Sequence, residues 1–346
     1  MPDLARIALG LALGTAGGVA FHLLGLPLPW MLGALSVTMV AAVAGLGVQG
    51  PVRLRPAIVA VIGVLLGSRF TPEVAEQAGQ AVLTLSILLV YLVVVAAVVV
   101  PFYRFVGRQD WTTAYFAGMP GGLSEMIELG EARGADVPSI VLAHSLRIVL
   151  TIGLMAFAFR VLLGHDVGGA GASALGQGAA LGPVDALLLA GCAGIGALAG
   201  TRLRLPAPTF LGPLILSAAV HMAGVTESAP PGMLVNAAQV ALGTILGCRF
   251  LGIAPAVLAR AGVLSLGATL LTLGLAGIAA LAMSRWAGVG VDQGLLALAP
   301  GGLTEMGLIA LAINADVAFV ALHHVLRILI VLVVAPLALQ IASRRA

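Results

Sequence analysis

Long apolar runs separated by short polar turns dominate this chain. A segment of about 20 apolar residues is long enough to cross the hydrocarbon core of a membrane. This rule predicts helices over residues 4–26, 29–46, 56–70, 81–106 and 137–162, and again over 184–203, 208–225, 233–250, 263–286 and 317–341. The pattern therefore predicts an all-α polytopic membrane protein.

Composition supports the same class. Hydrophobic residues make up 60% of the 346 residues and charged residues only 9%, with a mean hydropathy of +1.13. A soluble globular protein is about 25% charged. All 17 basic residues are arginine, and no soluble basic face is evident. We therefore expect membrane lipid and a small-molecule solute as partners, and no nucleic acid.

The chain contains an internal duplication with an offset of 180 residues. Between residues 120 and 147, 14 of 28 positions are identical to those between 300 and 327. Both copies begin Pro-Gly-Gly-Leu-(Ser/Thr)-Glu-Met and continue through Ala-Asp-Val to His-x-x-Arg. The predicted organisation is a first transmembrane repeat (1–163), a Gly/Ala-rich linker (164–182) and a second repeat (183–346).

Two further apolar segments, residues 110–134 and 292–314, are interrupted near their middle by Pro-Gly-Gly. Proline removes a backbone donor, and paired glycines permit conformations that other residues avoid. Both segments are therefore expected to be broken helices that enter and leave the membrane on one side. Interrupted segments in corresponding halves are the best sequence indication of a transporter's binding site.

Arginine placement favours this topology, because short cytoplasmic loops are enriched in basic residues. Without Arg147 and Arg327, which lie within helices, 15 arginines remain (17 − 2). Five crossings per half place 11 of them on one side and three on the other, with Arg133 in the hairpin. Six crossings largely remove the bias. We therefore expect ten spans in two inverted repeats, two re-entrant hairpins and both termini in the cytoplasm.

The glycine pairs define a candidate substrate site. A helix is expected to restart at Leu123 and Leu303, where its first amides lack partners and can hold an anionic group. The expected binding residues are Gly121, Gly122, Gly301 and Gly302. Ser124 and Thr304 could contribute hydroxyl ligands or could cap the restarted helices.

Arg147 and Arg327 lie near the middle of apolar helices. Arginine cannot lose its charge, so each needs a carboxylate, backbone carbonyls or a bound anion. Glu125 and Glu305 are the obvious partners within the protein. The arginines either bind an anionic substrate or form structural ion pairs, and the sequence leaves both open.

Four titratable residues are candidates for proton coupling: Glu125, His144, Glu305 and His324. Each histidine lies three residues before an arginine, on the same helical face. A histidine can relay protons near neutral pH, although a hydrogen-bonded packing role is an alternative. His323 and His324 are the only histidines close in sequence, so we expect no metal and no cofactor.

The duplicated Pro-Gly-Gly-Leu-(Ser/Thr)-Glu-Met motif, the Ala-Asp-Val after it and the final His-x-x-Arg resemble the bacterial AbrB-type integral membrane family in a duplicated form. Its members are often labelled as ammonia monooxygenases or as regulators of aidB expression. The resemblance covers essentially the whole chain. It implies a location in the bacterial inner membrane.

The sequence therefore predicts a secondary transporter of a small anionic or zwitterionic solute, coupled to protons and working by alternating access. A channel or a membrane-embedded regulator of gene expression is the alternative. A monooxygenase is disfavoured, because copper sites need clustered ligands. A homodimer is compatible with the glycine-rich helix faces.

Overall fold

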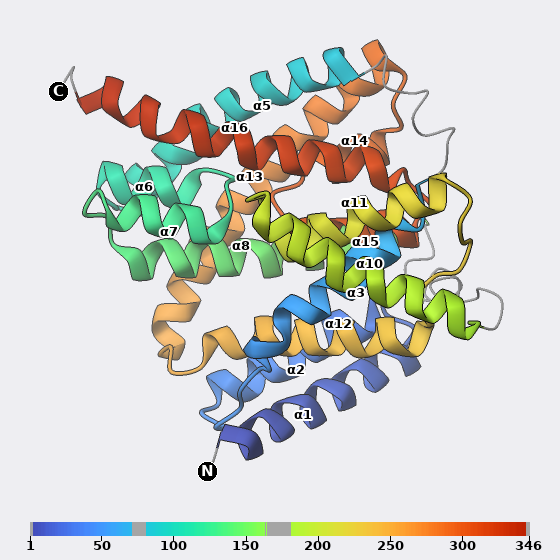
Figure 1. The fold of residues 1–346 in the computed structure, drawn as a ribbon. Coiled ribbons are helices and arrows are strands. Elements are labelled where there is room, and N and C mark those ends of the chain that lie inside the picture. The colour runs from blue at the N-terminus through green and yellow to red at the C-terminus, as the bar shows by residue number, and fades with distance from the viewer. Residues whose placement is uncertain (1–2, 71–80, 163, 165–180, 344–346) are drawn as a thin grey trace. The chain divides into compact units, whose positions relative to one another are not determined.

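The computed structural model describes residues 3–70, 81–162, 164 and 181–343, and in these residues the chain is helical without strands (Figure 1). The helices of the first half are α1 (Asp3–Leu23), α2 (Pro29–Val43), α3 (Arg55–Gly67), α5 (Ala81–Pro101), α6 (Trp111–Gly118), α7 (Leu123–Glu131) and α8 (Val137–Phe157). Those of the second half are α10 (Pro183–Arg202), α11 (Pro208–Met222), α12 (Gly232–Gly247), α13 (Pro255–Ala287), α14 (Val291–Leu298), α15 (Leu303–Ala312) and α16 (Val317–Ser343).

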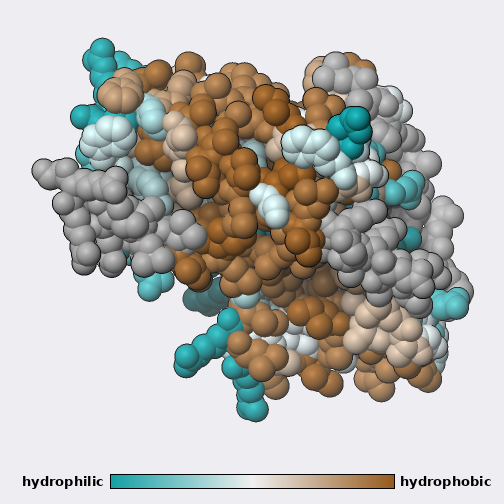
Figure 2. Space-filling view, turned by 90° about the horizontal axis from the view of Figure 1, so that it is seen from above, coloured by the Kyte–Doolittle hydropathy of each residue, from teal (hydrophilic) through white to brown (hydrophobic). Residues whose placement is uncertain are grey.

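Among the residues that the structure describes, six stretches of helix are long and apolar enough to cross a membrane: Asp3–Leu23, Val82–Val106, Val137–Val161, Pro183–Arg202, Gly232–Phe250 and Pro255–Ala287. Hydrophobic side chains also cover much of the surface seen in Figure 2. These features are consistent with the predicted all-α polytopic membrane protein. The helices α2, α3 and α11 have 15, 13 and 15 residues, or roughly 20–22 Å, shorter than a bilayer core of about 30 Å. The number of crossings therefore stays a prediction.

The chain forms two compact units, and each unit takes segments from both sequence halves. The first unit comprises Met1–Gln77, Ile152–Pro255 and Gly307–Ala318. The second comprises Ala78–Thr151, Ala256–Met306 and Phe319–Ala346. These two units differ from the predicted sequence repeats, 1–163 and 183–346. The division into repeats stays a prediction. Most of the predicted linker, residues 165–180, lies outside the described residues.

Glycines allow the helices of the first unit to approach each other closely. A Cβ on Gly17 of α1 would collide with the carbonyl oxygen of Gly33 in α2. In the second half, a Cβ on Gly212 of α11 would collide with the carbonyl oxygen of Gly196 in α10. Small residues at such crossings are typical of helix packing in membranes, where burial of apolar surface gives little driving force.

Within the first unit, helices from one sequence half pack against helices from the other half. The helix α2 packs against α12, and α11 packs against α3. At the first crossing, a Cβ added to Gly243 of α12 would collide with the Met31 carbonyl. At the second, a Cβ added to Gly63 of α3 would lie 2.5 Å from the Phe210 carbonyl oxygen. The two halves of the chain are therefore held together by the same type of contact, made twice.

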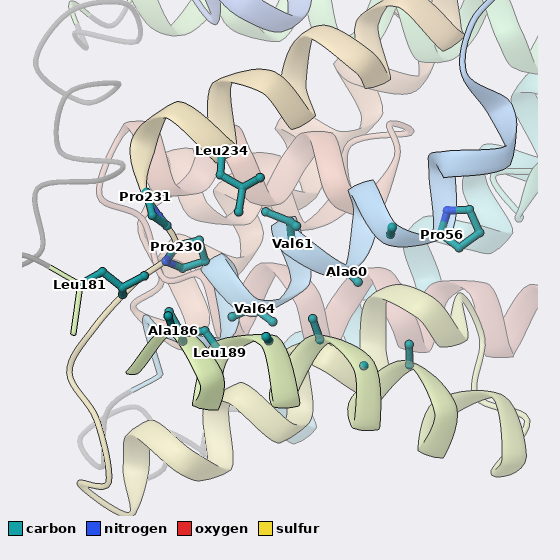
Figure 3. A pocket seen from close by; sticks show the side chains of 15 residues that line it. Pro56, Ala60, Val61, Val64, Leu181, Ala186, Leu189, Pro230, Pro231 and Leu234 are labelled. Carbon is teal, nitrogen blue, oxygen red and sulfur yellow. The ribbon is translucent and has the colours of Figure 1, made fainter. Parts of the chain in front are cut away.

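An apolar groove of about 620 Å³ lies in the first unit (Figure 3). Side chains of α3 and α10 form its walls, and Pro230, Pro231 and Leu234 at the start of α12 complete it. None of the residues lining this groove is charged.

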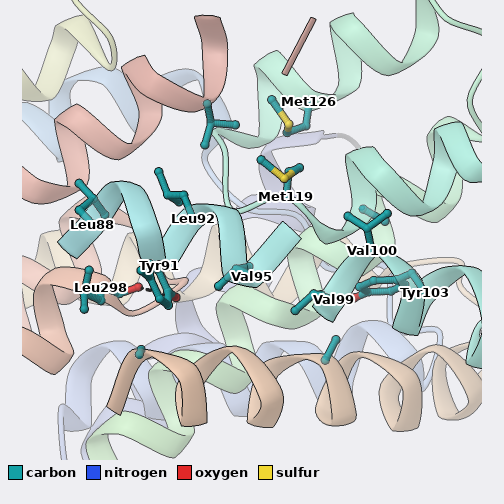
Figure 4. Close-up of a cluster of buried hydrophobic side chains, with 14 of the residues drawn as sticks. Leu88, Tyr91, Leu92, Val95, Val99, Val100, Tyr103, Met119, Met126 and Leu298 are labelled. Atoms are coloured by element: carbon teal, nitrogen blue, oxygen red, sulfur yellow. Dashed lines mark hydrogen bonds between the residues drawn. The ribbon is translucent and has the colours of Figure 1, made fainter. Parts of the chain in front are cut away.

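The second unit is organised around one face of α5. The side chains Leu88, Tyr91, Val95 and Val99 are buried along this helix, and Tyr103 is buried in the π-helical turn that follows it, Phe102–Val106 (Figure 4). They pack in one cluster with buried residues of α6, α7, α8, α13 and α14. This cluster includes Met119 in the first interrupted segment and Leu298 at the end of the helix before the second interruption.

Both Pro-Gly-Gly segments interrupt a helix. The helix α6 ends at Gly118 and α7 begins at Leu123, while α14 ends at Leu298 and α15 begins at Leu303. Gly122 at the N-cap is extended, with φ −68° and ψ 140°. The helices restart at the two predicted leucines, 180 residues apart. The re-entrant course of these segments through a membrane stays a prediction.

We expect Gly212→Ala to lower the free energy of unfolding by about 1–3 kcal/mol, because the added Cβ forces the α10 and α11 backbones apart. Gly194→Ala on α10 is the matched control, since no atom lies within 4 Å of a Cβ built there. Thermal unfolding in detergent, followed by size-exclusion chromatography, measures both variants. Equal unfolding temperatures for the two variants would contradict the packing described.

Candidate functional site

The predicted His-x-x-Arg residues are buried in the second unit. His144 and Arg147 lie on α8 and are 1% and 5% exposed, and His324 and Arg327 lie on α16 and are 0% and 4% exposed. The chain therefore buries two guanidinium groups among apolar helices. Such burial is costly unless every donor and the charge find partners.

Arg147 binds the end of the helix that precedes the first break. Its Nη1 donates to the carbonyl oxygens of Ala117 and Gly118, each at 3.3 Å. These carbonyls belong to the last turn of α6, which has no helical partner for them and carries the negative end of the helix dipole. The guanidinium therefore caps α6 from a different helix.

Arg327 makes the corresponding contacts at the second break. Its Nη1 donates to the carbonyl oxygens of Leu298 and Ala299. Its Nη2 donates to the Gly301 carbonyl oxygen at 3.1 Å, inside the Pro-Gly-Gly segment itself. Among the described residues, Arg147 binds no carbonyl beyond Gly118, so the two sites are similar but not identical.

Each histidine connects its arginine to the same broken helix. The Nε2 atom of His144 lies 2.8 Å from the Phe116 carbonyl oxygen, and that of His324 lies 2.9 Å from the Leu296 carbonyl oxygen. The Nδ1 atoms accept from Arg147 Nη2 at 2.9 Å and from Arg327 Nη2 at 3.1 Å. These partners assign the neutral tautomer with the proton on Nε2, because arginine can only donate.

The two arginines retain donors without partners. In the part of the chain that the structure describes, the Nε atoms of Arg147 and Arg327 are buried and have no hydrogen-bond partner. Each guanidinium group therefore keeps one buried donor that no described residue satisfies.

The expected pair between Arg147 and Glu125 is not present among the described residues, in which Arg147 binds carbonyls and His144 instead. The reason is that the Glu125 side chain folds back onto the start of its own helix. A Cβ added to Gly122 would collide with the Glu125 carboxylate, and one added to Gly302 would collide with that of Glu305. A carboxylate at the third helical position is stabilised by the positive helix end.

The remaining predicted binding residues surround these two helix starts. Gly121 and Gly301 lie over the buried side chains of Met126 and Met306, which would meet an added Cβ at 2.8 and 2.7 Å. Thr304 is partly buried in the first turn of α15, and the side chain of Ser124 lies outside the described part. In each half, the described site residues therefore lie around that half's own broken helix.

Tyr91 is a further residue of this site. Its hydroxyl donates to the Leu298 carbonyl oxygen at 3.0 Å (Figure 4). This carbonyl is also a partner of Arg327. The equivalent residue in the other half is Leu271, so the duplication did not reveal Tyr91. The available signal was a buried phenol in an apolar run, since tyrosine hydroxyls usually have a partner when buried.

The described residues contain no group of three or more His, Cys, Asp or Glu that could hold a metal ion. His323 is buried next to His324, and its Nδ1 lies 2.8 Å from the Phe319 carbonyl oxygen. The imidazole and phenol groups of the site already donate to backbone carbonyls. The Nε groups of Arg147 and Arg327 remain without a partner among the described residues.

Comparison with known proteins finds relatives along nearly the whole chain. A family model described as "Transition state regulatory protein AbrB" matches residues 4–343. The Bacillus subtilis (strain 168) "Uncharacterized protein YhjN" is 24% identical over 359 residues, covering 94% of this chain and 90% of that protein. The Escherichia coli (strain K12) "Putative regulator AbrB" is 27% identical over 328 residues, covering 92% and 90%. No solved structure matches the chain.

We expect His144→Phe to lower the free energy of unfolding by about 1–3 kcal/mol for each buried group left without a partner, here the Phe116 carbonyl and one Arg147 donor. His22→Phe is the control, because His22 is exposed and stacks on Trp30, a contact that phenylalanine can keep. Thermal unfolding of both variants in detergent measures the difference. A wild-type unfolding temperature for His144→Phe would show that these bonds do not stabilise the site.

Proposed function

We propose that this chain, which belongs to the AbrB family, is a secondary transporter of a small anionic or zwitterionic solute. The proposed location is the bacterial inner membrane, with both termini in the cytoplasm. The proposed topology is ten spans and two re-entrant hairpins, arranged as inverted repeats that alternate access to one site. In this proposal the chain is not an enzyme.

One observation carries the proposal. In both halves a helix is interrupted at Pro-Gly-Gly, and a buried arginine from a later helix binds carbonyls at the end of the helix before the interruption. Arg327 also binds the Gly301 carbonyl within the interruption. Irregular backbone at membrane depth persists only where protein or a water-filled cavity surrounds it. Broken helices at matching places in two repeats are the usual construction of a transporter's substrate site.

The charges support an anionic solute. Backbone carbonyls and neutral histidines satisfy arginine donors but supply no full negative charge. Burying a cation without a counter-charge costs several kcal/mol. The unpartnered Nε donors of Arg147 and Arg327 therefore favour an oxygen-bearing anion as the missing partner.

The glutamates support coupling to protons. Each one places its carboxylate at the helix start where an anion would otherwise bind. An ionised glutamate would repel that anion, and a protonated one would not. We therefore propose that Glu125 and Glu305 take up protons together with the solute. His144 and His324 each accept a hydrogen bond from an arginine and would hold that arginine in place. In this proposal the histidines carry protons only if those bonds break.

A regulator of gene expression is the second candidate, because the Escherichia coli relative carries the name of a regulator. A membrane-embedded regulator could bind the same solute and pass on a conformational change without net transport. Binding alone does not distinguish the two functions, whereas solute flux across a sealed membrane does.

In proteoliposomes, we expect the wild type to take up small carboxylates and Arg147→Gln or Arg327→Gln to abolish uptake. Each substitution removes the charge that attracts the anion. Arg285→Gln, on the exposed end of α13, is the control for loss of a positive charge. Folding of each variant is checked by thermal unfolding, and bound solute should raise the unfolding temperature of the wild type by mass action.

Binding without uptake in this assay would favour the regulator. Neither binding nor uptake of any carboxylate, with all variants folded, would reject the proposed site.

We expect Glu125→Gln and Glu305→Gln to make anion uptake less dependent on pH. Glutamine is neutral at every pH and therefore mimics the protonated carboxyl. Uptake by the wild type should rise as the pH falls, while the variants should stay near the acidic rate at neutral pH. Initial uptake rates between pH 5.5 and 8 measure this, and Glu131→Gln, an exposed carboxylate at the end of α7, is the control. Unchanged pH dependence in both site variants would place proton coupling elsewhere.

A further inference from the structure

The turn between α5 and α6 carries a cluster of arginines and exposed aromatic side chains. It follows directly on Val82–Val106, a stretch of helix long and apolar enough to cross a membrane. Phe105 and Trp111 are exposed, and their rings meet edge to face with centroids 5.8 Å apart. Tryptophan and arginine at the end of an apolar helix are typical of the membrane–water interface, where such side chains keep an apolar body in the lipid and a polar tip in water.

Arg104 is held against the tryptophan of this turn. Its guanidinium carbon lies 5.7 Å from the centre of the Trp111 ring, within the range of a cation–π contact. Its Nη1 donates to the Gln109 carbonyl oxygen at 2.8 Å, which is the one hydrogen bond of this half-buried guanidinium among the described residues. An arginine has five N–H donors. The turn therefore fixes the orientation of Arg104 and leaves Nη donors for a partner outside the protein.

Arg108 adds an exposed charge at a backbone position that favours glycine. Its φ is 54°, in the left-handed region. The equivalent residue of the second half, 180 positions later, is Gly288, with φ 68°. A residue with a Cβ costs free energy in this conformation, and glycine does not. The folding of the turn alone therefore does not explain why the first half has an arginine here.

A third arginine lies on the helix that packs against this turn. A Cβ added to Gly107 would lie 2.9 Å from Cδ2 of Leu264 in α13, so the two elements are in close contact. Arg260 is exposed one helical turn before Leu264, on the same face of α13. The positive charge of the turn therefore extends onto a second helix.

Two acidic residues lie near the turn, and both are bound at the starts of helices. Asp110 caps α6 by accepting from the Thr113 amide at 2.9 Å. Asp136 precedes α8 and accepts from the Ser139 hydroxyl, while its own amide donates to the Thr113 hydroxyl. Thr113 follows Trp111 by two residues, so it faces nearly the opposite side of α6. Neither acid forms an ion pair with the three arginines among the described residues, so their charge stays available to an anion.

We propose that the α5–α6 turn, together with Arg260, binds the head group of an anionic phospholipid. The phosphate accepts hydrogen bonds from Arg104 and Arg108, and the rings of Phe105 and Trp111 lie against the adjoining apolar part of the lipid. The exposed rings favour a lipid over a free phosphate ion, which has no apolar part. This inference needs a membrane around the chain and is independent of the proposed transport.

The test measures lipid binding to the full chain in neutral detergent by native mass spectrometry, which gives a Kd for the first lipid bound. Phosphatidylglycerol is the anionic probe, and phosphatidylcholine with the same acyl chains is the zwitterionic one. We expect the wild type to bind phosphatidylglycerol more tightly, by about fivefold for each arginine that contacts the phosphate, which is the effect of one basic residue at an anionic membrane surface.

Arg108→Gly gives the turn the residue of the second half. It removes one charge and relieves the left-handed backbone, so we expect the affinity for phosphatidylglycerol to fall about fivefold while the unfolding temperature without lipid does not fall. Arg104→Gln should weaken binding to a similar extent. Arg204→Gly is the matched control, because Arg204 is also exposed with φ 54° but belongs to the first unit. This control should bind the first lipid as the wild type does.

Four results would each overturn the inference. Equal affinity of the wild type for the two lipids would show that the head-group charge is not recognised. Wild-type affinity for phosphatidylglycerol in both Arg108→Gly and Arg104→Gln would place the lipid elsewhere. An equal loss in Arg204→Gly and Arg108→Gly would show a general attraction to surface charge. Inorganic phosphate that raises the unfolding temperature of the wild type as much as phosphatidylglycerol does would assign the turn to a soluble phosphate instead.

Discussion

The second unit depends on two buried arginines that bind the carbonyl ends of interrupted helices. A helix that stops inside a protein leaves its last carbonyls without partners and its dipole without compensation. Arg147 and Arg327 supply donors and positive charge to those ends, from helices that follow in sequence. The arginine needs acceptors as much as the broken helix needs donors, so neither feature is stable in an apolar unit without the other.

In the same arrangement, the hydrogen-bond partners of the two arginines supply no full negative charge. Carbonyl oxygens and neutral histidines satisfy hydrogen bonds but bring no net charge. The carboxylates of Glu125 and Glu305 lie next to Gly122 and Gly302 at the starts of the restarted helices. In the proposed transporter, protonation of these two carboxylates would make the site more positive and so couple anion binding to protons.

The first unit has a different basis of stability. Its helices approach at glycines, so that backbones meet where side chains would otherwise separate them. It contains no counterpart of the arginine-bound interruptions among its described residues. Pairs such as Gly17 with Gly33 and Gly196 with Gly212 recur in the two halves, and α2 and α11 each pack on a helix from the opposite half. Packing by shape and close contact suits a unit whose polar groups are few.

The sequence by itself determined the membrane-protein class, the duplication with its offset of 180, and the points where the helices restart at Leu123 and Leu303. These features are local, since hydropathy, proline and glycine act within a few residues of their position. It did not determine the partners of Arg147, which are carbonyls about 30 residues away rather than Glu125. It also did not identify Leu298 as the partner of Tyr91, or the units that combine both halves. Only the tertiary structure decides such choices, because a long side chain has several chemically suitable partners and the packing of distant helices selects among them.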